Sequence, residues 1–187
     1  MDIAKILPEI NLISEKSLKE KVVKIFEKAI DEGKWIDSDL ENIPFTLLIP
    51  ELINKNTLKP KITLIDHIRA VTNLVNATYN IYNNLGLVDS LNKNELIAGG
   101  LLHDIGKFLE YEKDKNGKIQ QSHSGTVLRH PAQGLEVVSE FKLPLAVRQA
   151  IIFHSKEGDQ INRLPEVEII SRCDFLCFIP VKKLLQQ

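Results

Sequence analysis

Apolar residues recur along this chain at intervals of three and four, the pattern of helices that bury one face. The clearest stripe spans residues 63–85, and others span residues 12–30 and 144–154. A further helix is predicted to begin at Pro165 and to carry Asp174 on its inward face. Long alternation of apolar and polar residues, which is typical of strands, does not occur. The pattern therefore predicts an all-α fold.

A short, strongly apolar run occupies the middle of the chain. It contains the pair Gly99-Gly100 and reaches Gly106, which is expected to stop the helix. A glycine pair inside a helix favours close helix packing over phosphate binding. Another helix is predicted to run to Phe141 from His130, which lies at or near its N-cap because proline follows it.

Two stretches lack this regular pattern. Residues 35–60 are interrupted by three prolines and leave room for a short helix over residues 46–53, so we expect a cover or substrate-side element there. Residues 110–124 are rich in charge and could form a lid or a hairpin. The expected organisation is an N-terminal helical extension, residues 1–60, packed on a main domain, residues 61–187.

Composition narrows the classes of function. The 187 residues contain 43% hydrophobic and 26% charged residues with a net charge of −1, so neither nucleic acid nor a membrane surface is an indicated partner. No apolar run is long enough to span a bilayer, and the start lacks the apolar core of a signal peptide, which favours a cytoplasmic location. Cys173 and Cys177 are expected to be reduced, buried thiols.

Some polar residues stand where the predicted helices are otherwise apolar, or where they end. They are four histidines and two aspartates, namely His67, His103, Asp104, His130, His154 and Asp174. Each alone is more simply explained as a core histidine bonded to a carbonyl group or as an aspartate in a salt bridge. Together they come from five predicted helices, and five separate exceptions are a poor explanation. We therefore interpret them as one cluster.

These residue types suit a metal. Imidazole binds Zn, Fe, Mn, Co and Ni, while carboxylates add oxygen ligands and can bridge two ions. Six ligands exceed the need of one tetrahedral site and fit two ions about 3.5–4 Å apart that share a carboxylate. The hypothesis is a site for divalent transition metal, with two ions favoured over one and the element left open.

The order of the six residues resembles the HD superfamily of metal-dependent phosphohydrolases. The segments that carry the resemblance are Asp66-His67-Ile68-Arg69-Ala70-Val71, Leu102-His103-Asp104-Ile105-Gly106-Lys107 and Arg172-Cys173-Asp174. The extra histidines of the members that bind two metals have similar counterparts in His130-Pro131-Ala132-Gln133-Gly134 and Ile152-Phe153-His154. The resemblance covers about residues 62–178 and implies an all-α helical bundle.

The resemblance also implies roles for the cluster. The first metal would be held by His67, His103, Asp104 and Asp174. Asp104, as the central catalytic residue, would bridge to a second metal that His130 and His154 complete. The implied reaction is hydrolysis of a nucleotide, phosphodiester or phosphoanhydride by a metal-activated hydroxide.

One branch of the superfamily is disfavoured. The members that cleave cyclic dinucleotides usually have a second histidine after the counterpart of His154, followed by a Gly-Tyr-Pro segment. Here Ser155 follows His154, and no Gly-Tyr-Pro segment occurs. The chain is therefore more similar to the shorter members that hydrolyse nucleotides, dinucleoside polyphosphates included. The expected partner is a small phosphorylated molecule.

Two cations beside the predicted ligands could contact this substrate. Lys107 follows His103 by about one helical turn, and it could bind the phosphate or stabilise charge that develops in the transition state. The alternative for Lys107 is a solvated lysine favoured by the dipole at a helix end. Weaker candidates than Lys107 are Arg129, which precedes His130 and could bind phosphate, Arg148, and His123 in the charged loop.

Three alternatives stay open. Some relatives use a mixed-valence di-iron pair to activate oxygen, and the same six ligands would serve that chemistry. A non-catalytic module could sense a nucleotide in the same pocket, although its ligand set would be expected to have degenerated. The simplest alternative is a helical domain whose buried polar residues pair structurally. Assembly into an oligomer is compatible with each of them.

Overall fold

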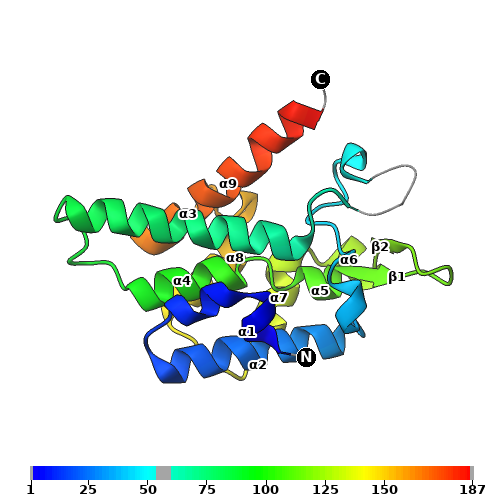
Figure 1. The fold of residues 1–187 in the computed structure, drawn as a ribbon, viewed down its shortest axis with the longest axis horizontal. Helices are drawn as coiled ribbons and strands as arrows, with labels where there is room; N and C mark the ends of the chain where they lie inside the picture. The colour runs from blue at the N-terminus through cyan, green and yellow to red at the C-terminus, as the bar shows by residue number, and fades with distance from the viewer. Residues whose placement is uncertain (1, 54–59, 186–187) are drawn as a thin grey trace.

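The computed structural model describes residues 2–53 and 60–185, so residues 1, 54–59 and 186–187 of the two predicted domains lie outside it. Helices dominate the described chain (Figure 1). In order, with η for short 3-10 helices, they are α1 Ile3–Ile6, η1 Pro8–Leu12, α2 Lys16–Glu32, η2 Asp37–Asp39, η3 Pro50–Leu52, α3 Leu64–Asn84, α4 Lys93–Leu102, α5 Lys107–Glu110, α6 His123–Val127, α7 His130–Val138, α8 Leu145–Phe153, η4 Lys156–Gly158 and α9 Pro165–Leu185.

The predicted all-α fold is confirmed. Within residues 2–53 and 60–185 the only sheet is a two-stranded antiparallel hairpin of β1, Tyr111–Lys113, and β2, Ile119–Gln121. Glu112 lies opposite Gln120 in this pairing. The charged stretch predicted as a lid or hairpin is therefore a hairpin.

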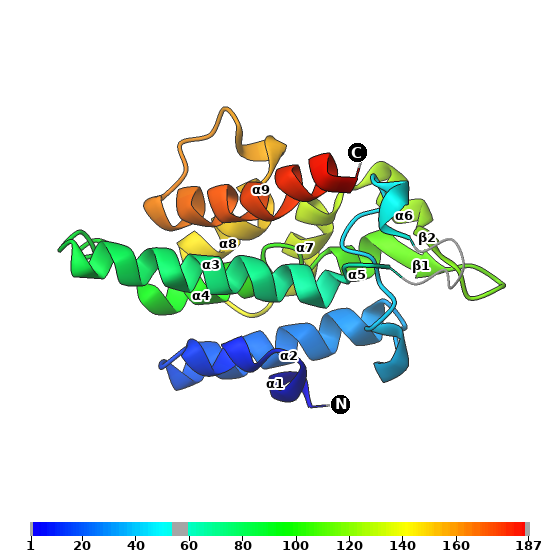
Figure 2. The same cartoon turned by 45° about the horizontal axis from the view of Figure 1, so that its top comes forward.

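Helix α4 lies at the centre of the bundle, in contact with α2, α3, α8 and α9. Figure 2 shows α3 and α4 between α9 on one side and α2 on the other. All residues from Leu96 to Leu102 are buried, as expected for a helix that is apolar on every side. Gly99 faces Ile170 of α9, and Gly100 faces Thr72 of α3. The glycine pair thus permits close packing, as predicted.

The start of α3 is fixed by a capping box. The Thr63 side chain accepts a hydrogen bond from the Asp66 backbone N–H, and the Asp66 carboxylate accepts one from the Thr63 N–H, each at 3.0 Å. His67 follows within the first turns of the helix and is 3% exposed. The local sequence therefore sets which face of α3 presents His67 to the core.

The end of α4 differs from the prediction. The helix ends at Leu102, and Gly106 is the N-cap of α5 with right-handed helical angles, so the predicted helix stop at Gly106 is wrong. A Cβ atom at Gly106 would collide with the carbonyl oxygen of His130. Glycine is needed here because the start of α7 crosses it closely, and the chain between the two helices carries Asp104 inward.

Other predicted helices agree with the structure except at their ends. Helix α2 begins at Lys16, and α7 ends at Val138. Of residues 46–53 only η3 is helical, because Pro50 can begin a turn, whereas the residues before it form bends without helical hydrogen bonds. Cys173 is buried, Cys177 is only half-buried, and both are free thiols.

The N-terminal segments contribute to the same hydrophobic core as the main helices. The core cluster contains side chains of α1, η1 and α2 together with those of α3, α4, α7, α8 and α9. Two polar contacts join these parts. Trp35 donates from Nε1 to the Phe108 carbonyl oxygen at 2.7 Å, and buried Glu9 accepts from Arg69 Nε at 3.0 Å and from Asn73 Nδ2 at 2.9 Å. The division at residue 60 stays a prediction.

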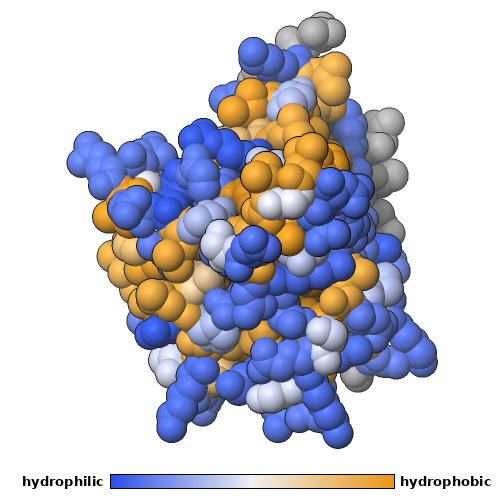
Figure 3. Space-filling model, turned by 90° about the vertical axis from the view of Figure 1, so that its left-hand side faces the viewer, coloured by the Kyte–Doolittle hydropathy of each residue, from blue (hydrophilic) through white to orange (hydrophobic). Residues whose placement is uncertain are grey.

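The surface carries both apolar and polar side chains. Figure 3 views the end of the molecule at the left of Figure 1 and shows hydrophobic groups interspersed with hydrophilic ones. Ile81, Leu85 and Leu87, at and beyond the end of α3, are among the exposed apolar residues. Across residues 2–53 and 60–185, no helix combines the length and the apolar character needed to cross a bilayer.

Replacing Glu9 with alanine tests the link between the extension and α3. The change leaves the Arg69 and Asn73 donors without their shared acceptor, so we expect the free energy of unfolding to fall by about 1–3 kcal/mol. Glu20→Ala is the control, because the Glu20 side chain is 59% exposed and its pairing with Lys16 is long at 3.9 Å; it should cost about 0.5 kcal/mol or less. Equal costs in denaturant unfolding would contradict the link.

Candidate metal centre

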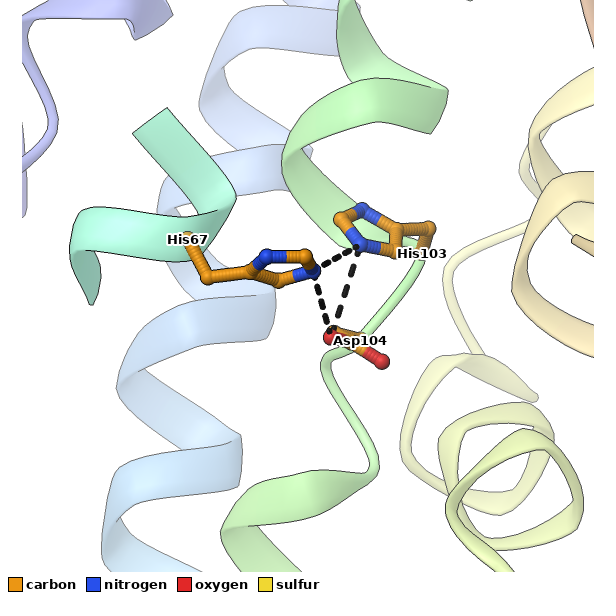
Figure 4. Close-up of side chains that lie close together, drawn as sticks. All are labelled: His67, His103 and Asp104. Carbon is orange, nitrogen blue, oxygen red and sulfur yellow. Dashed lines mark hydrogen bonds and ion pairs between the residues drawn. The ribbon is translucent and has the colours of Figure 1, made fainter. Parts of the chain in front are cut away.

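The structure brings all six predicted polar residues to one place. His67 comes from α3, and His103 and Asp104 follow the last residue of α4. The remaining members are His130 at the start of α7, His154 after the end of α8, and Asp174 in α9. Figure 4 shows His67 and His103 directed from two helices toward the Asp104 carboxylate. Their convergence agrees with the interpretation of the sequence as one cluster.

Asp104 lies at the middle of this cluster, and each of its oxygens faces a different pair of histidines. Oδ2 lies 3.3 Å from His67 Nε2 and 3.4 Å from His103 Nε2. Oδ1 lies 3.3 Å from His130 Nε2 and 3.6 Å from His154 Nε2. A carboxylate in this arrangement can offer one oxygen to each of two neighbouring cations.

The potential ligand atoms fall into two groups that share Asp104. In each group the ligand atoms lie within 4.8 Å of one another, and the members are His67, His103 and Asp104 in one and Asp104, His130 and His154 in the other. Asp174 adds an oxygen beside the first group, with Oδ1 at 3.0 Å from His67 Nε2. The donor set therefore fits one or two divalent transition metal ions.

Three of the histidines have their second ring nitrogen engaged. Nδ1 of His103 donates to the Gly100 carbonyl oxygen at 2.7 Å, and Nδ1 of His154 donates to that of Ala150 at 2.9 Å. A carbonyl oxygen only accepts, so the proton of each neutral ring is on Nδ1. Both Nε2 lone pairs are consequently available on the side that faces Asp104.

Glu110 provides the corresponding partner for His130. Its Oε2 accepts from the backbone N–H and from Nδ1 of His130, both at 2.7 Å. Burial raises the pKa of Glu110, but the hydrogen bonds and charge of His130 together with the charge of Lys107 outweigh burial and lower it. Sequence reasoning missed this residue, because a glutamate at the edge of a charged loop looks like an ordinary surface residue.

The electrostatics keep the cluster ready to bind a cation. Burial raises the pKa of Asp104, but Lys107 and His103 outweigh it and hold that pKa well below its usual range. Burial likewise raises the pKa of Asp174, but the hydrogen bond with His67 and the charges of His103 and His154 together bring it down to about 2. Both carboxyl groups are therefore ionised at neutral pH, as metal ligands must be.

The pKa values of two of the imidazoles are shifted in opposite directions. Burial lowers the pKa of His67, but hydrogen bonds to Asp104 and Asp174 outweigh it and raise the pKa above its ordinary value. For His130 burial is the larger effect and lowers the pKa despite the bond to Glu110. Without a metal, His67 is thus the imidazole that the two carboxylates help to protonate.

Lys107 lies against the cluster rather than in solvent. Its Nζ donates to Asp104 Oδ2 and to the Phe45 carbonyl oxygen, each at 2.7 Å, and the residue is 8% exposed. Burial lowers the pKa of Lys107, but the Asp104 carboxylate outweighs it and raises the pKa. The alternative of a solvated lysine at a helix end is wrong, because α4 ends at Leu102 and Lys107 begins α5.

A pocket of about 470 Å³ opens beside the cluster, within the range of sites for small organic ligands. All of the cluster except His103, which is completely buried, lines it. Lys107 and Arg129 line it too, and the Arg129 guanidinium pairs with Glu157. His123 is exposed and lies outside both the pocket and the cluster.

Comparison with known proteins identifies the family of the chain. A model of the HD domain family matches residues 64–178, which is more than half of the chain. A search of curated proteins and a search of solved structures gave no match. The matched region includes every member of the cluster and excludes the N-terminal extension.

Replacing Glu110 with alanine tests the orientation of His130. Outer partners of ligating histidines typically change metal affinity by about 10–100-fold, so we expect Glu110→Ala to weaken the binding of Mn²⁺ or Co²⁺ by that factor. Calorimetric titration of the metal-free protein measures this. Glu112→Ala on the exposed part of β1 is the control and should leave affinity unchanged. Equal affinities for the two variants would show that Glu110 has no such role.

Proposed function

The chain belongs to the HD domain family, and on this premise we propose that it is a metal-dependent phosphohydrolase. The expected substrate is a small phosphate ester or anhydride, with a nucleotide as the favoured class. One observation carries the proposal: the buried Asp104 carboxylate directs each of its oxygens at a separate pair of histidines. A purely structural carboxylate needs one partner rather than five.

The proposed ligands follow from that arrangement. His67, His103, Asp104 and Asp174 would hold one ion, and Asp104, His130 and His154 would hold a second. When bound, such ions supply a nucleophilic hydroxide at neutral pH and neutralise charge on the substrate phosphate. The protein's own side chains would orient the ligands, balance the charge of Asp104 and bind the substrate.

Those side chains have distinct tasks. The carbonyl groups of Gly100 and Ala150 hold two imidazole rings in the tautomer that exposes Nε2, and Glu110 does so for His130. Lys107 offsets the negative charge of Asp104 and lines the pocket, where it can also meet a phosphate oxygen. Arg129, which lines the same pocket and is 40% exposed in its side chain, would contact an anionic substrate by exchanging its pairing with Glu157 for a phosphate oxygen.

Activity should depend on Asp104 and on added metal. The experiment is a screen of nucleotides, phosphodiesters and phosphoanhydrides with Mn²⁺, Fe²⁺, Co²⁺ and Ni²⁺. For any substrate that is hydrolysed, Asp104→Ala should lower kcat/KM more than about 100-fold and abolish metal binding, because it removes the shared ligand. His123→Ala is the matched control, since His123 is the one histidine of the chain outside the cluster.

Two outcomes would contradict the proposal. The first is full activity in the presence of excess chelator after metal analysis has shown a metal-free protein. The second is oxygen consumption by the iron-loaded protein with no phosphate release from any substrate in the screen. The latter result would favour the di-iron oxygenase that the same ligand set permits.

The number of ions gives a separate prediction. Wild-type protein equilibrated with Mn²⁺ or Co²⁺ and then desalted should retain two ions per chain by elemental analysis. His154→Ala should retain one, because the change removes a ligand of the second group and leaves the first group intact. His123→Ala should again match the wild type. A single ion in wild type, unchanged in His154→Ala, would show that the site is mononuclear.

A further inference from the structure

The pocket beside the cluster is larger than a phosphate group requires, so its other walls indicate what else the substrate carries. Its volume is about 470 Å³. One wall is apolar and is formed by Phe45, Leu47 and Leu48 of the extension together with Phe175 and Phe178 of α9. We refer to these five residues as the apolar wall. The lining also includes the polar residues Arg129, Ser155 and Lys156.

The aromatic rings of the apolar wall lie directly beside the ligand group. The Phe45 ring is stacked on the His67 ring with 4.8 Å between centroids and 23° between planes. The Phe178 ring meets Phe45 edge to face at 6.1 Å and 77°. A ring attached to a phosphate that is bound at the cluster would therefore be close enough to contact the Phe45 and Phe178 rings.

Three of the five residues of the apolar wall lie outside the segment that matches the family model. Residues 45–48 precede the matched segment, and Phe178 is its last residue. The wall is supported by a second hydrophobic cluster, made of Phe45, Ile49 and Leu52 with Ile62, Phe178, Val181 and Leu185 packed on it. The family region thus provides the potential ligands together with Phe175 and Phe178, and residues 45–48 of the flanking chain complete the apolar wall.

Backbone contacts hold residues 45–48 in place. The Phe45 carbonyl oxygen accepts from Lys107 Nζ at 2.7 Å, and the same Nζ bonds Asp104. The Phe45 N–H donates to the Ile62 carbonyl oxygen at 3.4 Å, and the Leu48 N–H donates to Thr46 Oγ1 at 3.1 Å. The wall is therefore positioned before a ligand arrives, which lowers the entropy lost on binding.

We propose that the apolar wall is a binding site for a planar, largely apolar ring of the substrate, so that the preferred substrates are phosphate esters that carry an aromatic or heteroaromatic ring. This inference rests on the proposed function. A polar polyol phosphate would bury hydroxyl groups against the phenylalanine rings without hydrogen-bond partners, which costs binding energy. An aromatic group instead gains contact area with the rings and leaves the phosphate at the cluster.

Two phosphonates with the same charged group test the proposal without requiring turnover. Phenylphosphonate carries the aromatic ring, and methylphosphonate lacks it. Calorimetric titration of the metal-loaded, full-length protein should give a Kd about 10–100-fold lower for phenylphosphonate, because burial of a ring this size contributes that much. Equal Kd values, or no binding of either phosphonate, would overturn the proposal.

Substitutions in the apolar wall test whether these residues cause the preference for phenylphosphonate. Phe178→Ala should raise the Kd of phenylphosphonate about tenfold, and Leu48→Ala about two- to threefold, while the Kd of methylphosphonate changes less than twofold. Leu48 is 77% exposed, so its substitution leaves the fold intact even if Phe178→Ala lowers the Tm. Phe45 is left unchanged because its ring lies on His67.

Leu184→Ala is the matched control, since Leu184 lies on α9, is 69% exposed and does not line the pocket. It should leave both Kd values unchanged. If Phe178→Ala and Leu48→Ala weakened the binding of both phosphonates by the same factor, the proposal would be overturned. If substrates release phosphate but phenylphosphonate binds no better than methylphosphonate, this inference fails and the proposed function stands. If phenylphosphonate binds better but no substrate releases phosphate, the proposed function fails and the aromatic binding site stands.

Discussion

The buried carboxylate of Asp104 is the group on which the rest of the structure depends. An ionised carboxylate at 2% exposure is costly unless charges and hydrogen-bond donors surround it. Lys107 balances part of its charge, and four imidazoles arrive from α3, α4, α7 and α8 to face its two oxygens. Helices α3, α8 and α9, which pack on α4, therefore contribute polar ligand residues to this cluster as well as apolar side chains to the core.

The same residues link the centre to its surroundings. Lys107 contacts both Asp104 and the backbone of Phe45, so the extension is coupled to the centre through one side chain. Phe45 then covers His67 and joins the hydrophobic cluster at the end of α9. In this arrangement the helical core provides the potential metal ligands, while the extension and α9 together form the apolar part of the pocket beside them.

Much of this could be predicted because the signals were local. His67 interrupts an apolar stripe, His103-Asp104 ends an apolar helix, and Asp174 lies on an inward face, so helical periodicity alone places them toward the core. The contacts of Glu110, Phe45 and the true end of α4 depend instead on residues distant in sequence. At Gly106, for example, a side chain would collide with the backbone at the start of α7. The residues next to Gly106 in the sequence do not indicate that α7 passes so close.

The central claim is that Asp104 is shared between two metal sites, and anomalous diffraction from crystals of the manganese- or cobalt-loaded protein tests it most directly. The account predicts two anomalous peaks about 3.5–4 Å apart, with one oxygen of Asp104 directed at each. One peak would lie by His67, His103 and Asp174, and the other by His130 and His154. An absence of metal density around Asp104 in protein shown by elemental analysis to contain metal would contradict the account.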